Sequence, residues 1–430
     1  MEIKNDFWWQ LHYFFVNDIL IHQHKMRGAL LLMWAWKLME EDNKNRRQEE
    51  QQADEDEDPR FVSLLDSAGR RRRDRRIARP SLLLPEESPW SMILNRGNDA
   101  CMITATGLDN QSFFALHRLF YPYYKNFTPY SDNGKIVPLK KRKTRSGRPR
   151  LLSSEAVLGL VLTYNRTSCQ EYVLCQLFGL TATPLNLWLK FGRMVLVKVL
   201  RSNVYGRVER NPSQETVDSW KDAITSMYPS LKNVYCVADG LKLMLESTDN
   251  DLVQSMFYNG WTHDHYVTNL LVFAPDGTII DCVLNCPGSM HDSELVAFFG
   301  GVYQRLREQY EKHGGKCVMD SAFCSRGNAF VIKSAQDVTL GEDAQEYTML
   351  RDATSMRQAA EWGMRALQGT FPRLKARLKY EEHGERKCIL QCIMLVYNFR
   401  ARYCGINQIR TTFMPHLDRD CEALIARDLS

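Results

Sequence analysis

Two apolar segments, each ending in an aspartate, constrain the fold of this chain more than any other feature of its sequence. Asp239 directly follows Val234–Ala238, and Asp320 directly follows Lys316–Met319. Short runs of β-branched and other apolar residues predict buried strands. A carboxylate at the end of such a strand is costly unless water, a partner or a cation compensates its charge. The two segments therefore predict a sheet with acidic residues at the edge where ligands usually gather.

The surrounding segments predict a mixed α/β domain at residues 231–405, followed by a C-terminal tail at 406–430. Further strands are expected at Leu241–Leu245, Tyr266–Ala274 and Ile279–Leu284. Helices are expected at His291–Lys312, Arg326–Ser334, Thr354–Gln368 and Glu385–Tyr403. An early run of strands, followed by helices around one further strand, indicates a mixed sheet flanked by helices.

A third carboxylate, Glu361, lies inside the expected helix Thr354–Gln368, with Arg357 one turn before it on the same face. Together with Asp239 and Asp320, Glu361 could hold two Mg²⁺ or Mn²⁺ ions, which prefer oxygen ligands. Two such ions about 4 Å apart can activate a water and stabilise the leaving oxygen during phosphodiester cleavage. Acidic residues are needed because an amide would not offset the charge of the ions. The three carboxylates together favour a metal-dependent nuclease, and the alternative interpretation of a strand-end Asp is a turn former or a helix cap.

A helical region at residues 151–230 precedes this domain. Helices are expected at Ala156–Thr163, Cys169–Phe178 and Pro184–Leu200, with Gly179 in the turn between the last two. This order is typical of a helix-turn-helix DNA-binding unit, although any small helical bundle shares it. In the helix-turn-helix interpretation, the third helix presents three side chains to DNA, namely Asn186, Lys190 and Arg193.

The length of 430 residues is sufficient for two or three domains. Residues 1–60 are expected to form a helical segment and an acidic linker, and residues 61–150 a basic, partly helical region. The Arg70–Arg76 run is typical either of a nuclear import signal or of a solvated charge cluster. The apolar stretch Ala29–Trp36 is too short to cross a bilayer, which takes about 20 residues, so no membrane association is expected.

The net charge is only +5, but basic residues are concentrated in local clusters. Gly147–Arg150 resembles an AT-hook, in which Arg148 and Arg150 would lie in a narrow minor groove. An ordinary basic linker is the alternative interpretation of that segment. A second cluster follows the helix of Glu361 and contains Arg373, Lys375, Arg377 and Lys379. Such clusters bind phosphate backbones even when a whole chain is nearly neutral, so DNA is the expected partner.

Several segments resemble the central region of PIF/Harbinger-type transposases. They are Phe257–His265, Asn285–Ser293, Arg357–Gly363, Phe371–Lys375 and Val396–Phe399, in the order typical of that family. The resemblance covers about Arg148–Tyr403 and implies an RNase H-like catalytic domain behind the helix-turn-helix-like region. It also implies that Asp239, Asp320 and Glu361 are the catalytic and metal-binding acids of a DDE-type endonuclease.

An enzyme of that family would use Mg²⁺ or Mn²⁺, as two ions, to cleave and transfer DNA strands at transposon ends in the nucleus. PIF/Harbinger elements commonly encode a separate Myb/SANT-like DNA-binding protein. The resemblance therefore implies such an accessory protein as a partner, beside terminal-repeat and target DNA. A homo-oligomer is a further candidate assembly.

The sequence departs from the family around the second acid. Members of the family often have Gly before that Asp and Tyr-Pro after it, whereas Asp320 is flanked by Met319 and by Ser321–Cys324. Asp292, after His291, is the alternative second acid, or else the cap of the helix that follows. His291, Asp292 and Arg357 are candidates for orienting the metal ligands. The altered surroundings of Asp320 keep a second function open, that of a domesticated, catalytically inactive descendant that binds DNA or chromatin.

Overall fold

The structure is a computed structural model that describes residues 77–132, 135–139, 150–246, 251–290, 295, 301–323, 328–334, 344–379 and 383–415. Arg76–Ser430 form one compact unit, and the boundaries predicted at 151, 231 and 406 lie inside it. The helical segment expected within residues 1–60 lies outside the described residues.

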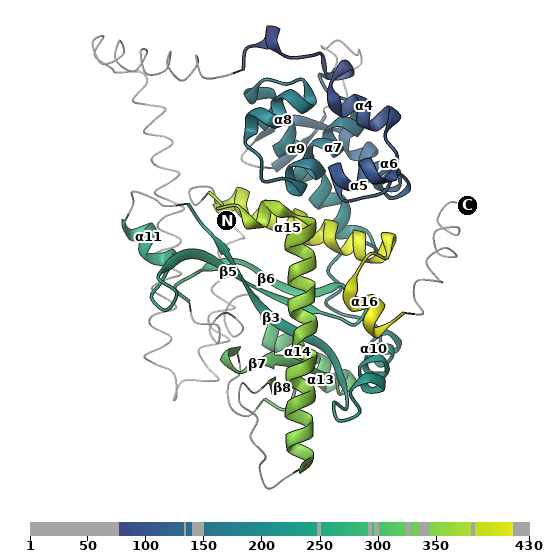
Figure 1. The fold of residues 1–430 in the computed structure, drawn as a ribbon, viewed down its shortest axis with the longest axis vertical. Helices are drawn as coiled ribbons and strands as arrows, with labels where there is room; N and C mark the ends of the chain where they lie inside the picture. The colour runs from purple at the N-terminus through teal and green to yellow at the C-terminus, as the bar shows by residue number, and fades with distance from the viewer. Residues whose placement is uncertain are drawn as a thin grey trace. The chain divides into compact units, whose positions relative to one another are not determined.

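The first part of the compact unit is mainly helical (Figure 1). Its elements are η1 (Arg79–Ser81), η2 (Pro85–Glu87), α4 (Pro89–Arg96), α5 (Asp99–Thr106), α6 (Asn110–Asn126), β1 (Phe127–Asp132), β2 (Lys135–Pro138), α7 (Ser154–Arg166), α8 (Glu171–Phe178), α9 (Ala182–Ser202) and α10 (Gln214–Met227). Side-chain oxygens of Ser88, Asn98, Asp109 and Ser153 accept backbone N–H groups in the first turns of α4 to α7. Such caps satisfy N–H groups that a helix cannot pair itself, so they determine where these helices begin.

The three helices predicted in the helix-turn-helix interpretation are present as α7, α8 and α9. Gly179 ends α8 with a φ of 65°, in the left-handed region that favours glycine. A second glycine, Gly159, brings α7 close to α4, because a Cβ there would lie 2.0 Å from the ring of Trp90. Trp90 also stacks on Phe178 of α8 at 5.2 Å between ring centroids. The helices therefore pack around a shared aromatic core.

A six-stranded mixed sheet forms the second part of the unit (Figure 1). Its strands are β3 (Val234–Met244), β4 (Tyr258–Asn259), β5 (Asp264–Phe273), β6 (Ile279–Pro287), β7 (Lys316–Asp320) and β8 (Val331–Ser334). β5 pairs antiparallel with both β3 and β6, while β7 pairs parallel with β3 and β8 pairs parallel with β7. The resulting order β6-β5-β3-β7-β8, with β4 against the start of β5, is compatible with an RNase H-like fold. The predicted mixed α/β class is confirmed.

Helices flank this sheet and connect it to the first part. They are α11 (Asp251–Phe257), α13 (Val302–His313), η3 (Ser321–Phe323), α14 (Ala344–Thr370), η4 (Pro372–Lys375), α15 (His383–Phe399), the π-helical turn η5 (Arg400–Cys404) and α16 (Gln408–Phe413). The long α14 packs across β3, β5, β7 and β8, whereas α15 packs against both β6 and α9 (Figure 1). Gly363 lets α14 approach the sheet closely, because a Cβ there would lie 2.7 Å from the ring of Phe273.

Three secondary-structure predictions are wrong. The helix expected at Arg326–Ser334 is replaced, within its described residues, by strand β8, because parallel pairing with β7 buries Ile332 and Ser334. The region expected at residues 61–150 to be basic and partly helical also contains the β1–β2 hairpin, which was not predicted, although Asn133-Gly134 is a hairpin signal in the sequence. The two strands expected on either side of Asp239-Gly240 are one strand, β3, since β5 pairs with it along its length.

None of the described helices combines the length and apolar character that crossing a membrane would need.

Candidate active site

Asp239 and Asp320 lie side by side on neighbouring parallel strands. Ala238 of β3 is in register with Met319 of β7, so the aspartate after each of them occupies the equivalent position. Neighbouring strands are about 4.8 Å apart, which places the two carboxylates within reach of one another. The sequence predicted Asp239 at the end of a strand, whereas the structure places it inside β3. The parallel pairing of β3 with β7 nevertheless stops at Ala238. The pairing of β3 with β7 therefore ends where the two aspartates begin.

Gly240, the residue after Asp239, has a specific packing role. A Cβ at Gly240 would lie 3.0 Å from the ring of Phe323, which is buried in η3 just after Asp320. The carbonyl of Phe323 accepts a hydrogen bond from the hydroxyl of Tyr303 on α13. The aromatic residue that follows the second aspartate thus packs against the glycine that follows the first.

Glu361 on α14 is connected to Asp239 by the side chain of Arg357, which contacts both carboxylates. The guanidinium of Arg357 contacts Asp239 Oδ2 at 3.2 Å and Glu361 Oε1 at 3.3 Å. Arg365, one turn further along α14, lies 3.7 Å from Glu361 Oε2 and is 79% exposed. The Arg-x-x-x-Glu-x-x-x-Arg spacing could have identified Arg365 from the sequence, because residues four apart share a helix face.

The electrostatics of Asp239 connect all three predicted acids. Burial raises the pKa of the Asp239 carboxyl, and the charges of Asp320 and Glu361 raise it further. The Gly240 N–H, which donates to Asp239 Oδ1 at 2.7 Å, and the Arg357 guanidinium act in the opposite direction. The ionised form of Asp239 is therefore disfavoured in the absence of a nearby cation, and a bound cation would relieve the repulsion.

Among the described residues, no group of three or more His, Cys, Asp or Glu side chains is arranged to hold a metal ion. The guanidinium of Arg357 supplies the positive charge between Asp239 and Glu361 instead. A set of carboxylates drawn from two strands and one helix still matches the oxygen ligands that Mg²⁺ and Mn²⁺ prefer. The chemistry of these three side chains therefore suits a divalent metal, although Arg357 lies between Asp239 and Glu361 in the described structure.

Arg193 was predicted to contact DNA, and that prediction is wrong. Its side chain is 1% exposed, and its guanidinium pairs with Glu385 of α15 at 2.9 Å. The same guanidinium lies 5.1 Å from the ring centroid of Tyr164. Asn186 and Lys190 are exposed on α9, but Arg193 further along the helix is buried. The part of α9 that contains Arg193 packs against α15.

Two other predicted DNA contacts hold the protein together. Arg150 donates to the carbonyls of Tyr124 and Phe127 and stacks over the Tyr124 ring at 4.3 Å. Arg373 donates to the carbonyls of Tyr164 and Cys169, and its guanidinium lies 4.0 Å from the Tyr164 ring centroid. Their guanidinium groups join segments that are distant in the sequence, which assigns them a structural role.

The remaining candidates for DNA contact differ in their surroundings. Asn186 and Lys190 are exposed on α9, and the Asn186 amide donates to Glu171 of α8 at 2.7 Å. Lys375 is exposed at the end of η4. DNA contact by these three residues stays a prediction. Arg148, His291 and Asp292 lie outside the described residues.

Part of the sequence resemblance is explained by structural roles. Asn285 has a φ of 67°, and its side chain accepts from Arg386 Nε and donates to the carbonyl of His383. Asn398 both donates to and accepts from the backbone of Ile279, at 2.8 Å each. These asparagines attach α15 to the two ends of β6 and so stabilise the sheet.

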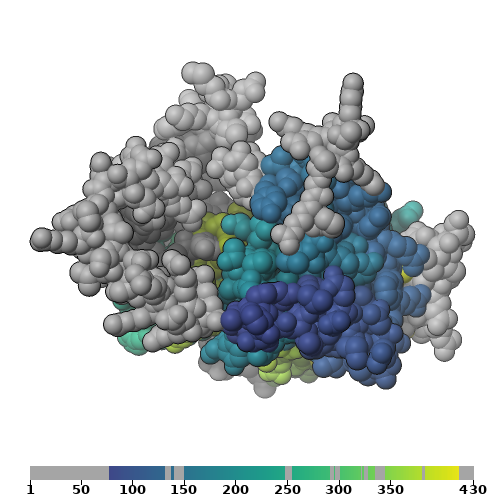
Figure 2. Space-filling model, turned by 90° about the horizontal axis from the view of Figure 1, so that it is seen from above, coloured from purple at the N-terminus to yellow at the C-terminus, as the bar shows by residue number. Residues whose placement is uncertain are grey.

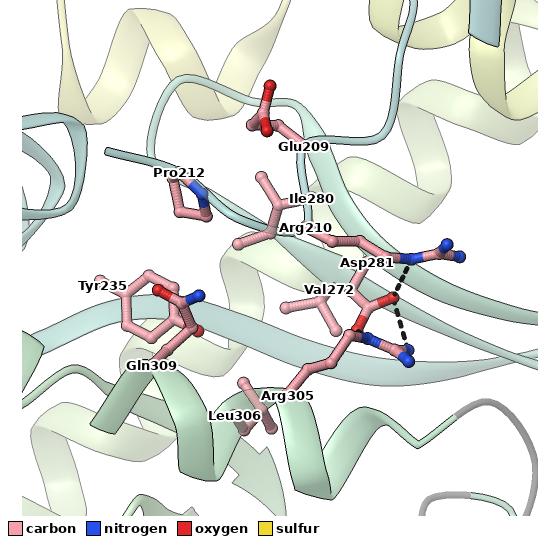
Figure 3. A pocket seen from close by; sticks show the side chains of 10 residues that line it. All are labelled: Glu209, Arg210, Pro212, Tyr235, Val272, Ile280, Asp281, Arg305, Leu306 and Gln309. Carbon is pink, nitrogen blue, oxygen red and sulfur yellow. Dashed lines mark hydrogen bonds and ion pairs between the residues drawn. The ribbon is translucent and has the colours of Figure 1, made fainter. Parts of the chain in front are cut away.

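A small hollow lies between β6, α13 and the segment before α10, and none of the three acids lines it (Figure 3). There the Asp281 carboxylate accepts a hydrogen bond from Arg210 Nε at 3.1 Å. It also accepts hydrogen bonds from Nε and Nη2 of Arg305, at 2.7 and 2.9 Å. None of the predicted catalytic residues lines this hollow. Its central carboxylate pairs with two guanidinium groups, so Arg305 joins α13 to β6 and Arg210 joins the segment before α10 to β6.

Comparison with protein families gives one match. Residues 238–398 match the family described as DDE superfamily endonuclease. The matched segment contains Asp239, Asp320 and Glu361, and it extends from the middle of β3 to the end of α15. Comparisons with curated proteins and with solved structures found no match.

Proposed function

We propose that this chain is a DDE-type transposase of the PIF/Harbinger kind, which cleaves DNA strands at transposon ends and transfers them to target DNA. One observation carries the proposal. Asp239 interacts electrostatically with Asp320 and Glu361, and these acids come from three separate elements of the segment that matches the DDE superfamily endonucleases. Acidic groups gathered at one place on a mixed sheet are suited to two-metal phosphodiester chemistry.

Asp239, Asp320 and Glu361 would hold the two Mg²⁺ or Mn²⁺ ions. The bound metal would activate the attacking oxygen and stabilise the leaving one. β3 and β7 fix the spacing of the aspartates, and α14 carries Glu361 to them. Burial of Asp239 lowers the effective dielectric around the reacting phosphate, which strengthens electrostatic stabilisation of developing charge.

DNA would be held mainly through its phosphates. Lys375 lies beside Arg377 and Lys379 on the exposed segment after η4, and Asn186 and Lys190 lie on the exposed face of α9. Contacts of this type position a duplex without reading its sequence. We further propose a nuclear location, a Myb/SANT-like accessory protein and self-association as the setting in which the enzyme acts.

The decisive experiment measures cleavage and strand transfer by the purified full chain on terminal-repeat DNA, with and without Mg²⁺. Asp239→Asn should lower the Mg²⁺-dependent rate by about 10³-fold, because the loss of a metal ligand exceeds the 10- to 100-fold cost of losing an outer partner. DNA affinity should be unchanged. If Asp239→Asn cleaves as fast as the wild type, the assignment is wrong.

The same experiment addresses the domesticated, inactive alternative. Absence of cleavage by the wild type, together with tight and salt-dependent DNA binding, would favour a binding protein over an enzyme. Absence of measurable DNA affinity at low salt would contradict both functions.

Arg357 provides a test of the metal site that does not depend on cleavage. Its guanidinium bridges Asp239 and Glu361, so a metal that binds there must displace it. Arg357→Gln should therefore raise the affinity for Mn²⁺, measured by titration calorimetry, by about 10-fold, which corresponds to about 1.4 kcal/mol. A charge-assisted hydrogen bond contributes a free energy of this order.

Arg365→Gln is the matched control for that titration. Arg365 also approaches Glu361, but it is 79% exposed and its ion pair is with Glu361 at 3.7 Å, so its loss should change Mn²⁺ affinity less than about 2-fold. Equal affinities for the wild type and Arg357→Gln would show that the guanidinium does not compete with the metal.

A further inference from the structure

Trp261 is the most exposed large hydrophobic side chain among the described residues, at 91%. It lies in the turn between β4 and β5, at one end of the sheet. Aromatic side chains of this size are normally buried, because their exposure to water is unfavourable. An indole that is almost fully exposed on an ordered turn indicates a binding partner with a flat apolar face.

The turn that carries Trp261 is held by hydrogen bonds on both sides of the indole. Asn259 Oδ1 accepts the N–H groups of Trp261 and Thr262, both at 3.1 Å. The Asn259 amide donates to the carbonyl of Gly288, at the end of β6, at 2.8 Å. The backbone of the turn that carries the indole is therefore held to the sheet, so less backbone entropy is lost when a partner binds.

Basic residues lie at the same end of the sheet. Leu378 forms a parallel bridge with Leu245, and the Leu245 N–H donates to the carbonyl of His265 on β5 at 2.9 Å. His265 in turn pairs with Tyr258 of β4, three residues before Trp261. The segment after η4, the end of β3, the start of β5 and β4 thus lie next to one another in this order.

Exposed cations gather on the described residues of these segments. They are Lys242 of β3, Lys375 at the end of η4, and Arg377 and Lys379 after it. Among the described residues of the same segments, the acidic side chains are Glu246 and Asp264, and Asp264 accepts the N–H of His265. Exposed cations next to an exposed aromatic side chain are complementary to nucleic acid, which offers both phosphates and flat bases.

The distance from the predicted acids suits the same partner. Leu271, which pairs with Asp239, is six residues along β5 from His265. At about 3.4 Å per residue, His265 is about 20 Å along the strand from the position of Asp239, and the turn of Trp261 lies just before the start of β5. A duplex that is cleaved at the acids extends over such a distance.

We infer that Trp261 stacks on an unpaired or unstacked base of the DNA whose phosphates lie along Lys375, Arg377 and Lys379. The inference rests on the proposed function, because it takes DNA as the substrate. It adds a recognition element for DNA that is melted or distorted near the cleavage site, since a base buried in a duplex does not present its face to an indole.

The test measures binding by the full chain to oligonucleotides that carry 2-aminopurine, whose fluorescence is quenched when it stacks. The probes are a single strand, a perfect duplex and a duplex with one unpaired base. Trp261→Ala should weaken binding to the single strand and to the duplex with the unpaired base by about 10- to 100-fold and remove the quenching. Binding to the perfect duplex should change less than about 2-fold.

Two further variants distinguish stacking by Trp261 from a general loss of surface area. Trp261→Phe should restore most of the affinity and quenching, because a smaller ring still stacks. Tyr130→Ala removes another exposed aromatic side chain, 71% exposed in β1, and should leave every affinity unchanged.

The outcomes separate this inference from the proposed function. If Trp261→Ala binds all three probes like the wild type, or if Trp261→Phe is as weak as Trp261→Ala, stacking by Trp261 is refuted while DNA cleavage by the acids is unaffected. If the wild type binds no DNA at low salt, the proposed function fails, and the inference fails with it.

Discussion

Asp320→Asn should abolish Mg²⁺-dependent DNA cleavage, lowering the rate by about 10³-fold or more, whereas Asp292→Asn should cost at most about 100-fold. The reason is positional. Asp320 is the neighbour of Asp239 in the parallel register of β3 and β7, and its charge contributes to the raised pKa of Asp239. A direct metal ligand cannot be replaced by an amide without loss of the charge that offsets the ions, while an orienting residue affects the metal only through its ligands.

The two variants should be compared in single-turnover cleavage and in Mn²⁺ titration. Both should bind terminal-repeat DNA like the wild type and give the wild-type circular dichroism spectrum, so that a folding defect is excluded. Loss of Mn²⁺ binding is expected in Asp320→Asn but not in Asp292→Asn. The reverse result, with Asp292→Asn inactive and metal-free, would identify Asp292 as the second acid.

Gly363→Val should both destabilise the protein and reduce cleavage, although Gly363 is not itself a candidate ligand. A Cβ at Gly363 would lie 2.7 Å from the Phe273 ring, so a valine has to move α14 away from β5. Such overpacking typically lowers the free energy of unfolding by about 1–3 kcal/mol. Because Glu361 is carried by the same turn of α14, the shift also misplaces a carboxylate. A displacement of about 1 Å can cost about 100-fold in rate.

Gly369→Ala is the control on the same helix. No atom lies within 4 Å of a Cβ built at Gly369, so the substitution needs no rearrangement. Alanine is a better helix former than glycine, and the free energy of unfolding should rise by about 0.5–1 kcal/mol with unchanged cleavage. Chemical denaturation and single-turnover rates measure both effects. A Gly363→Val protein as stable and active as the wild type would show that close packing of α14 does not position Glu361.

Local patterns were sufficient to predict most of the elements around the acids. The apolar runs before Asp239 and Asp320 are strands, the Glu361 segment is helical, and α7, α8 and α9 are present where the sequence predicted helices, with Gly179 in the turn between the last two. These features depend on residues close together in the sequence. The segment at Arg326–Ser334 was mispredicted because only its pairing with β7 makes part of it a strand, and no local pattern reveals that partner.

Residue type alone was a poor guide to the function of the arginines. Arg193, Arg150 and Arg373 all fit a DNA-binding pattern in the sequence. The structure places the first in the interior beside Glu385 and uses the other two to connect backbone segments. An arginine offers several donors in a planar group, so it is equally suited to phosphates and to backbone carbonyls. Which of these it binds is decided by the packing of distant segments.

The sequence by itself determined which residues carry charge, which segments bury themselves and in what order the acidic strands and the Glu361 helix occur. Hydrophobic periodicity and helix capping depend on residues that are close together in the sequence, so both can be recognised without a structure. Only the tertiary structure decided that the residues after Ala238 and Met319 become neighbours and that Arg357 lies between Asp239 and Glu361. Strand register and helix docking depend on side chains far apart in the chain, because a sheet fixes its partners only through the core that they bury together.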